Sequence, residues 1–115
     1  MTLYDEVTID EEVKAALDGK VLSWPNTSAG QTYGGVSYQT EGEPFAVLLE
    51  GVLALRLPPE LLTRGLTLAG VSPFRPPNED REVDGWIQFV VLLAEDVPDL
   101  VPWVEAAYKY VTSTG

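Results

Sequence analysis

The chain of 115 residues contains neither histidine nor cysteine, and only seven of its residues are lysine or arginine. The absence of cysteine excludes disulfide bonds, thiolate nucleophiles and iron–sulfur clusters, and the absence of histidine excludes an imidazole general base. Together the two absences exclude zinc sites built from nitrogen and sulfur ligands, and haem held by either residue. Carboxylates, hydroxyls and lysine amines remain as the groups available for chemistry.

Charge of one sign dominates, because 18 acidic residues against seven basic ones give a formal net charge of -11. Nucleic acids and anionic membranes are bound largely through lysine and arginine, so this balance disfavours them as partners. Hydrophobic residues nevertheless make up 45% of the chain, which is enough to form a folded core. The length, with no repeat or linker, predicts a single domain over residues 1–115.

No segment of the sequence predicts secretion or membrane insertion. The first residues have no positively charged start and no apolar run, so they do not form a secretory signal. The longest strongly apolar stretch, Trp86 to Ala94, is far shorter than the ~18 residues that span a bilayer. We therefore expect a cytoplasmic protein that does not bind membranes.

Apolar residues at helical spacing predict a helix near each end of the chain. The first is expected over residues 9–18, with Thr8 as its N-cap and Gly19 at its C-terminal end. The second is expected to begin at Asp99, with Pro102 in its first turn. A brief helical turn is predicted at residues 59–62.

The segments between these helices predict strands. Residues 33–40, 45–49, 52–57 and 85–93 are strand-like, and the short turns between the first three favour antiparallel hairpins. Residues 73–84 are expected to form a polar, proline-bearing loop. The order of elements predicts an α+β fold, an antiparallel sheet with the N- and C-terminal helices packed on one face.

Two of these strands, residues 45–49 and 85–93, are apolar on both faces. In a two-layer domain, by contrast, one face of the sheet is exposed to solvent and carries polar residues. The second face needs a cover, which the chain itself, a strongly curled sheet, a partner subunit or an apolar ligand could provide. The sequence leaves these alternatives open. The candidate interaction surface consists of apolar residues on these strands: Phe45, Val47, Trp86, Phe89 and Val91.

Two segments are similar to ligand-binding loops but lack their defining residues. In an EF-hand register, Asp80, Glu82 and Asp84 take the first ligand positions, but position 12 is Val91 where a glutamate is required. The glycine-rich residues 29–35 precede a strand rather than the lysine and helix of a phosphate-binding loop, so the glycines indicate close backbone approach. We expect no metal and no cofactor.

Several short motifs, taken in order, resemble the TfoX N-terminal domain. They are Tyr33-Gly34-Gly35-Val36, Gly42-x-Pro44-Phe45-Ala46, Leu53-x-Leu55-Arg56-Leu57 and Gly70-x-x-Pro73-Phe74. The C-terminal part is similar to the related MmcQ/YjbR domains, from Gly85-Trp86-Ile87 to Ala106-Ala107-Tyr108. Over residues 8–112 the resemblance implies an α+β domain similar to CyaY-like or secretion-chaperone-like folds, and it implies no reaction.

The main functional hypothesis is a non-enzymatic binding or adaptor domain that self-associates through its apolar sheet face, as a homodimer, or binds a protein partner there. This hypothesis depends on the strand around Phe89, which is apolar on both faces, and on the lack of a recognisable set of catalytic residues in the sequence. The alternative, implied by the MmcQ/YjbR resemblance, is a DNA-binding regulator. Its candidate nucleic-acid contacts are Arg56, Arg64, Arg75 and Arg81. An enzyme that uses paired carboxylates is a third hypothesis, for which the sequence assigns no residues.

Overall fold

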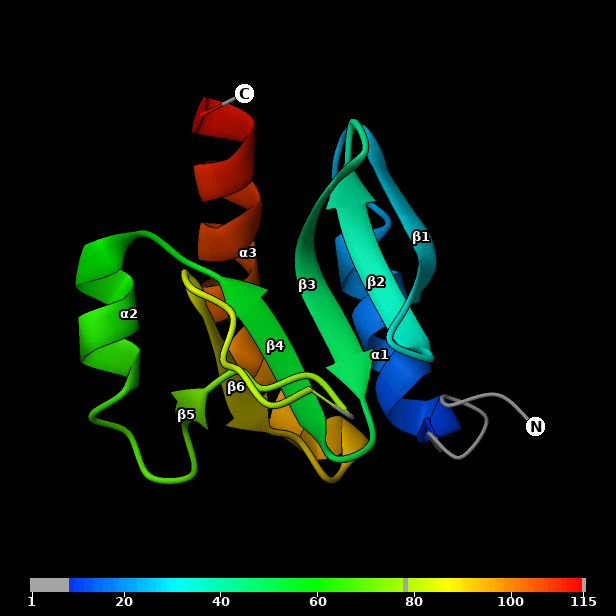
Figure 1. The fold of residues 1–115 in the computed structure, drawn as a ribbon. Coiled ribbons are helices and arrows are strands. Elements are labelled where there is room, and N and C mark those ends of the chain that lie inside the picture. The colour runs from blue at the N-terminus through cyan, green and yellow to red at the C-terminus, as the bar shows by residue number, and fades with distance from the viewer. Residues whose placement is uncertain (1–8, 78, 115) are drawn as a thin grey trace.

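The computed structural model describes residues 9–77 and 79–114 and shows an antiparallel sheet with two helices behind it (Figure 1). Its elements are α1 (Glu11–Val21), β1 (Thr27–Thr32), β2 (Gly35–Thr40), β3 (Glu43–Leu49), β4 (Val52–Arg56), α2 (Pro59–Gly65), β5 (Ser72–Pro73), β6 (Trp86–Val90), the 3-10 turn η1 (Ala94–Asp96) and α3 (Val97–Thr114). This confirms the α+β class and the packing of the N-terminal and C-terminal helices on one face of the sheet.

The sheet has the strand order β1-β2-β3-β4-β6-β5, and every neighbouring pair is antiparallel. The predicted hairpins β2–β3 and β3–β4 are therefore confirmed. The outer strand β1 was not predicted, because its small and polar residues give no apolar alternation. Residues 57–85 separate β4 from β6, yet these two strands lie side by side in the sheet.

Two of the hairpin turns have the backbone conformation that matches the twist of paired strands. Tyr33 and Gly34 have φ of 55° and 80°, and Glu41 and Gly42 have φ of 50° and 84°. Positive φ at both central residues is the mark of the two-residue type I′ turn. The glycine-rich residues 29–35 thus form β1 and a hairpin turn, and no helix that could meet a phosphate follows them.

The chain approaches its neighbour closely at Gly35, as the glycine pattern indicated. A Cβ atom at Gly35 would collide with the carbonyl oxygen of Leu48 and lie 2.6 Å from Cδ2 of Leu49. Both atoms belong to the neighbouring strand β3. Only glycine therefore fits here without displacing the strand.

Helix α1 begins and ends later than its sequence pattern predicts. The Asp10 carboxylate caps it by accepting hydrogen bonds from the backbone N–H groups of Glu12 and Val13, at 2.9 and 3.1 Å. The predicted cap, Thr8, lies outside the described residues. The prediction that Gly19 ends the helix was wrong, because the helix continues to Val21, whose side chain is buried in line with the two preceding apolar turns.

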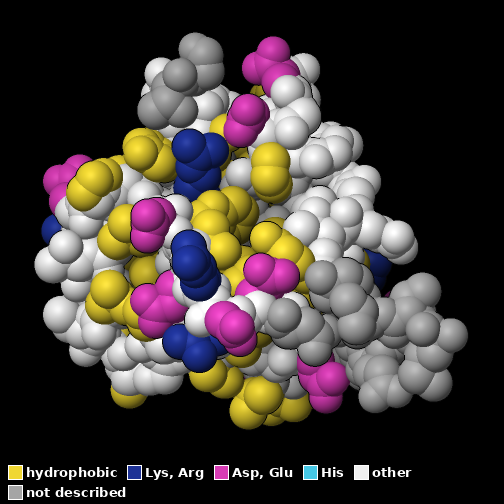
Figure 2. All heavy atoms as spheres, viewed as in Figure 1, with side chains coloured by type: hydrophobic (Ala, Val, Ile, Leu, Met, Phe, Trp, Pro, Cys, Tyr) yellow, Lys and Arg dark blue, Asp and Glu magenta, His cyan; other side chains and the backbone are white. Residues whose placement is uncertain are grey.

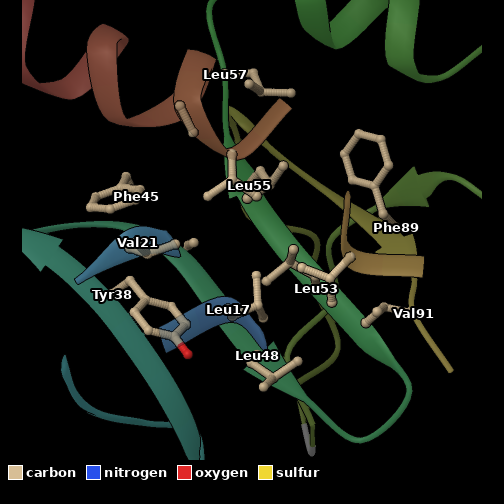
Figure 3. Close-up of a cluster of buried hydrophobic side chains, with 14 of the residues drawn as sticks. Leu17, Val21, Tyr38, Phe45, Leu48, Leu53, Leu55, Leu57, Phe89 and Val91 are labelled. Carbon is tan, nitrogen blue, oxygen red and sulfur yellow. The ribbon is translucent and has the colours of Figure 1, made fainter. Parts of the chain in front are cut away.

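The main hydrophobic core lies between the sheet and the two long helices. Figure 3 shows side chains from α1, β2, β3, β4 and β6 meeting in this layer. Tyr38, Phe45, Leu53 and Leu55 are completely buried there. The ring of Phe45 also meets that of Tyr108 on α3 edge-on, with centroids 5.5 Å apart.

A polar network lies at the edge of this core, where Tyr38 meets two partly exposed side chains of α1. The hydroxyl of Tyr38 donates to Asp18 Oδ1 at 2.7 Å, and Lys14 Nζ binds the other carboxylate oxygen at 2.7 Å. Burial, reinforced by the hydrogen bond to Asp18 and by its charge, raises the pKa of Tyr38 far above its ordinary value. The hydrogen bond to Asp18 is also the main cause that raises the pKa of Lys14.

The raised pKa of Tyr38 predicts a loss of stability in alkali. The unfolded chain releases the tyrosine proton near pH 10, whereas the folded chain retains it, so each pH unit above 10 lowers the free energy of unfolding by about 1.4 kcal/mol. Tyr38→Phe keeps the ring and removes this dependence, while Lys14 contributes in both proteins. Urea unfolding at pH 9, 10 and 11 measures the difference, and parallel profiles for the two proteins would contradict the prediction.

The end of β6 and the start of α3 also differ from expectation. The strand ends at Val90 rather than at residue 93, because the Asp96 carboxylate accepts the backbone N–H groups of Leu92 and Leu93 at 3.1 and 3.0 Å. Helix α3 then begins at Val97, so Asp99, which was predicted to cap the helix, lies within its first turn. Pro102 consequently lies in the second turn rather than the first.

Candidate functional site

The face of the sheet opposite the helices is covered by the chain itself. The cover, here called the strap, consists of residues 74–77 and 79–85, which pass in front of the sheet in Figure 1. Its Phe74 is 1% exposed and packs with Val47, Leu49 and Ala54 of the sheet. Backbone hydrogen bonds from Phe74 N–H to the carbonyl of Trp86 (3.2 Å) and from Val83 N–H to the carbonyl of Phe74 (2.9 Å) fix the strap. The segment is a loop, as expected, but Phe74 within it is buried against the sheet, which was not predicted.

The residues of the sequence-predicted interaction surface are divided between the two faces. Phe45, Phe89 and Val91 belong to the core under the helices, whereas Val47 and Trp86 belong to the cluster under the strap. Four of the five are at most 3% exposed, and Trp86 is half-buried. The five residues therefore do not form one exposed surface, since the sheet separates them and the helices and strap cover them.

A cavity of about 220 Å³ opens beneath the strap. Its lining residues come from β1, the β1–β2 turn, β3, the strap and β6: Thr32, Tyr33, Pro44, Val47, Phe74, Val83 and Trp86. Phe74 stands between two other aromatic rings, with centroids 5.9 Å from Tyr33 and 6.1 Å from Trp86. Two of the sequence-predicted residues, Val47 and Trp86, thus lie together at one site.

The four arginines of the nucleic-acid alternative lie on three separate parts of the chain. Arg56 ends β4 and pairs with Glu43 at 3.5 Å, and Arg75 in the strap pairs with Glu82 at 3.9 Å. Arg64 on α2 borders a cavity of about 180 Å³ between α2 and α3, and Arg81 is exposed in the strap. On the face shown in Figure 2, basic side chains alternate with acidic ones rather than forming a basic patch.

An exposed group of apolar side chains lies where β6 ends. Val90, Leu92 and Leu93, here called the apolar patch, are 49%, 63% and 54% exposed. The hydrogen bonds to Asp96 hold the backbone of the two leucines, so the structure fixes them in this exposed position. The connection from α2 to β5, which carries the exposed Leu66 and Leu68, lies at the same lower end of the molecule in Figure 1.

The surroundings of the apolar patch are acidic. A cavity of about 280 Å³ beside Leu92 has Asp10 and Glu50 as its charged lining residues. Glu95 and Asp96 follow the patch directly in the chain. The N-terminal end of α1, which packs against η1, adds the acidic first turn of that helix to the same region.

Neither a metal centre nor a membrane span is found in the part of the chain that the structure describes. Within residues 9–77 and 79–114, no three acidic side chains come together as metal ligands. Asp80, Glu82 and Asp84 are exposed on the strap. None of the described helices combines the length and the apolar character needed to cross a bilayer.

No family model, curated protein or solved structure matches the chain. The resemblance to TfoX and MmcQ/YjbR domains therefore stays a prediction. The candidate sites must be judged from their own residues and geometry.

Two features of these sites were missed at the level of sequence. Phe74 lies in a loop, as the sequence predicts, but the sequence did not predict that its side chain is buried against the sheet. Leu92 and Leu93 continue the apolar alternation of β6 and so were assigned to the strand. The signal that separates them from it is Asp96, a carboxylate three and four residues downstream that can bind their N–H groups.

Proposed function

We propose that this chain is a non-enzymatic binding domain that docks a protein partner through the apolar patch. The observation that carries the proposal is the exposure of Leu92 and Leu93, 63% and 54%, on a backbone segment held in place by Asp96. Neighbouring large apolar side chains that are fixed outside the core are typical of protein contact sites. Because the backbone that carries them is held before binding, little backbone conformational entropy is lost when a partner docks.

The acidic surroundings indicate the chemistry of the partner. A second copy of the chain would bring its own net charge of -11 to the contact, and like charges facing each other oppose association. A segment with apolar residues on one side and lysine or arginine around them would complement both the leucines and the carboxylates of Asp10, Glu50 and Glu95. We therefore propose a basic, amphipathic segment of another protein as the occupant.

This proposal moves the binding surface away from the sheet face, where the sequence placed it. The strap already covers that face, whereas the apolar patch lies at the end of the sheet. DNA binding has less support, because Arg56 and Arg75 are paired with carboxylates and the protein as a whole is acidic.

The proposal predicts selective binding of a basic amphipathic peptide. The probe is a synthetic helical peptide with leucines on one face and lysines on the other, and a scrambled peptide of equal composition controls for non-specific charge attraction. Fluorescence anisotropy is expected to show at least tenfold tighter binding of the amphipathic peptide. The double variant Leu92→Ser/Leu93→Ser is expected to lose this difference, which corresponds to about 1.4 kcal/mol.

The matched control is Leu22→Ser, because Leu22 is 41% exposed at the C-cap of α1, outside the apolar patch. This variant is expected to bind like the original protein. Equal affinities for the two peptides, or a double variant that still discriminates between them, would refute the proposal. A dimer seen by sedimentation that the double variant abolishes would also refute it, since the occupant would then be a second copy.

A further inference from the structure

The cavity beneath the strap carries an inference that is independent of the apolar patch. We propose that this cavity binds a methylated ammonium group, the chemistry shared by choline and by a methylated lysine side chain. Its volume of about 220 Å³ exceeds the roughly 150 Å³ of an apolar cavity known to accept benzene. A nitrogen bearing three methyl groups is of comparable bulk to benzene, so the space is sufficient.

Three of the seven described residues that line the cavity are aromatic. Tyr33, Phe74 and Trp86 come from three different segments, so the fold brings together rings that are distant in the sequence. Their planes are inclined, 70° between Tyr33 and Phe74 and 43° between Phe74 and Trp86, so the rings are not stacked in parallel. The faces of such rings attract cations, tryptophan most strongly, and sites for quaternary ammonium groups are built in this way.

The other lining residues favour a methylated ammonium over an unmodified one. Pro44, Val47 and Val83 are apolar, and the remaining residue is Thr32, so none of the described residues that line the cavity is charged. An unmodified ammonium would leave water without carboxylate partners to accept its three N–H bonds. A trimethylammonium has no N–H group to satisfy, and its methyl groups contact the apolar wall directly.

Charge around the opening favours a cation over a neutral group of the same shape. Glu43 precedes the lining residue Pro44, and Glu82 and Asp84 stand on either side of Val83, all three exposed. The strap carries four acidic and two basic residues in a chain of net charge -11. Its Arg75 is paired with Glu82. Figure 2 shows hydrophobic side chains in the middle of this face, with both acidic and basic side chains among them.

The experiment compares a cation with its neutral isostere on the full chain. Choline and tetramethylammonium are titrated against 3,3-dimethyl-1-butanol, in which carbon replaces the nitrogen of choline, and the indole N–H signal of Trp86 is followed by NMR. Both cations are expected to shift this signal, and the neutral alcohol is expected to bind at least tenfold more weakly. Equal binding of choline and the alcohol would overturn the proposal, because the site would then be simply apolar.

A second experiment, with peptides, decides whether the methylated ammonium belongs to a small molecule or to a lysine side chain of another protein. A trimethyllysine peptide is compared with the same peptide carrying unmodified lysine. Binding of the methylated peptide at least tenfold tighter than choline assigns the site to a protein side chain, and the reverse order assigns it to a small molecule. Equal affinities of the methylated and unmodified peptides at this site would contradict the proposal.

Variants locate the binding. Trp86→Leu is expected to weaken binding of tetramethylammonium at least tenfold, whereas Trp24→Leu is expected to leave it unchanged. Trp24 is the matched control because its ring packs on Tyr108, with centroids 5.1 Å apart, and does not line the cavity. If a thermal melt shows that Trp86→Leu is unfolded, Tyr33→Asn replaces it, since asparagine tolerates the φ of 55° found at this turn. Unchanged binding in the folded variant would refute the assignment.

Discussion

Replacing Phe74 with alanine is expected to lower the free energy of unfolding by about 3–5 kcal/mol. The side chain is 1% exposed and packs between the sheet and two other rings, so its removal loses buried apolar area and leaves a void. Small domains are stable by only about 5–15 kcal/mol, so this loss is a large fraction of the total. Urea unfolding followed by circular dichroism measures it.

The same variant tests whether the strap is the cover of the far face. Without Phe74, the apolar cluster of Val47, Leu49 and Ala54 is left without its principal contact, so we expect increased binding of a dye that reports exposed apolar surface. Arg81→Ala is the control in the same strap, because Arg81 is exposed, and it is expected to change stability by less than about 0.5 kcal/mol. A loss below about 1 kcal/mol for Phe74→Ala, with no added dye binding, would show that the strap does not close this face.

Gly35→Ala is expected to destabilise the protein by about 3 kcal/mol, although it adds a single methyl group. That group would collide with the carbonyl oxygen of Leu48, a backbone atom opposite Val36 in the β2–β3 pairing. A flexible side chain could move aside, but this carbonyl can move only if the strand shifts, so the cost is at the upper end of overpacking effects. Chemical unfolding measures the change.

Gly19→Ala provides a matched substitution with the opposite expected sign. Gly19 lies inside α1, and a Cβ atom there would meet nothing within 4 Å. Alanine is favoured over glycine in a helix interior by about 0.8–1.0 kcal/mol, so the variant is expected to be more stable by about that amount. If both glycine variants changed the free energy of unfolding by the same amount, this would contradict the assignment of a close contact to Gly35 and of a helical position to Gly19.

The parts of the fold that followed from sequence are those with strong local signals. The apolar positions Val13 and Leu17 placed the first helix, and turn glycines such as Gly42 and Gly51 placed the hairpins. Boundaries were less accurate because they depend on single side chains. The buried Val21 extends α1 past a glycine, and Asp96 ends β6 by binding backbone groups that would otherwise continue the ladder.

The candidate sites were predictable only in part, because apolar residues give no local signal of what covers them. The alternation of β6 places Trp86 and Phe89 on opposite faces, and the structure confirms that they lie in different clusters. The sequence did not show that Phe74 would return to cover one of those faces. The sequence also did not show that Leu92 and Leu93 would remain outside the core, because they are apolar like the buried residues of β6 that precede them.

The composition of the outer strand β1 bears on how two copies of the chain could meet. It forms one edge of the sheet, and its six residues include no lysine, no other charged residue and no proline. Edge strands usually carry such residues to prevent pairing with another chain. Here protection against edge-to-edge stacking falls to long-range repulsion between whole molecules of net charge -11. The net charge of the molecule and the composition of this edge strand therefore act on the same contact between two copies.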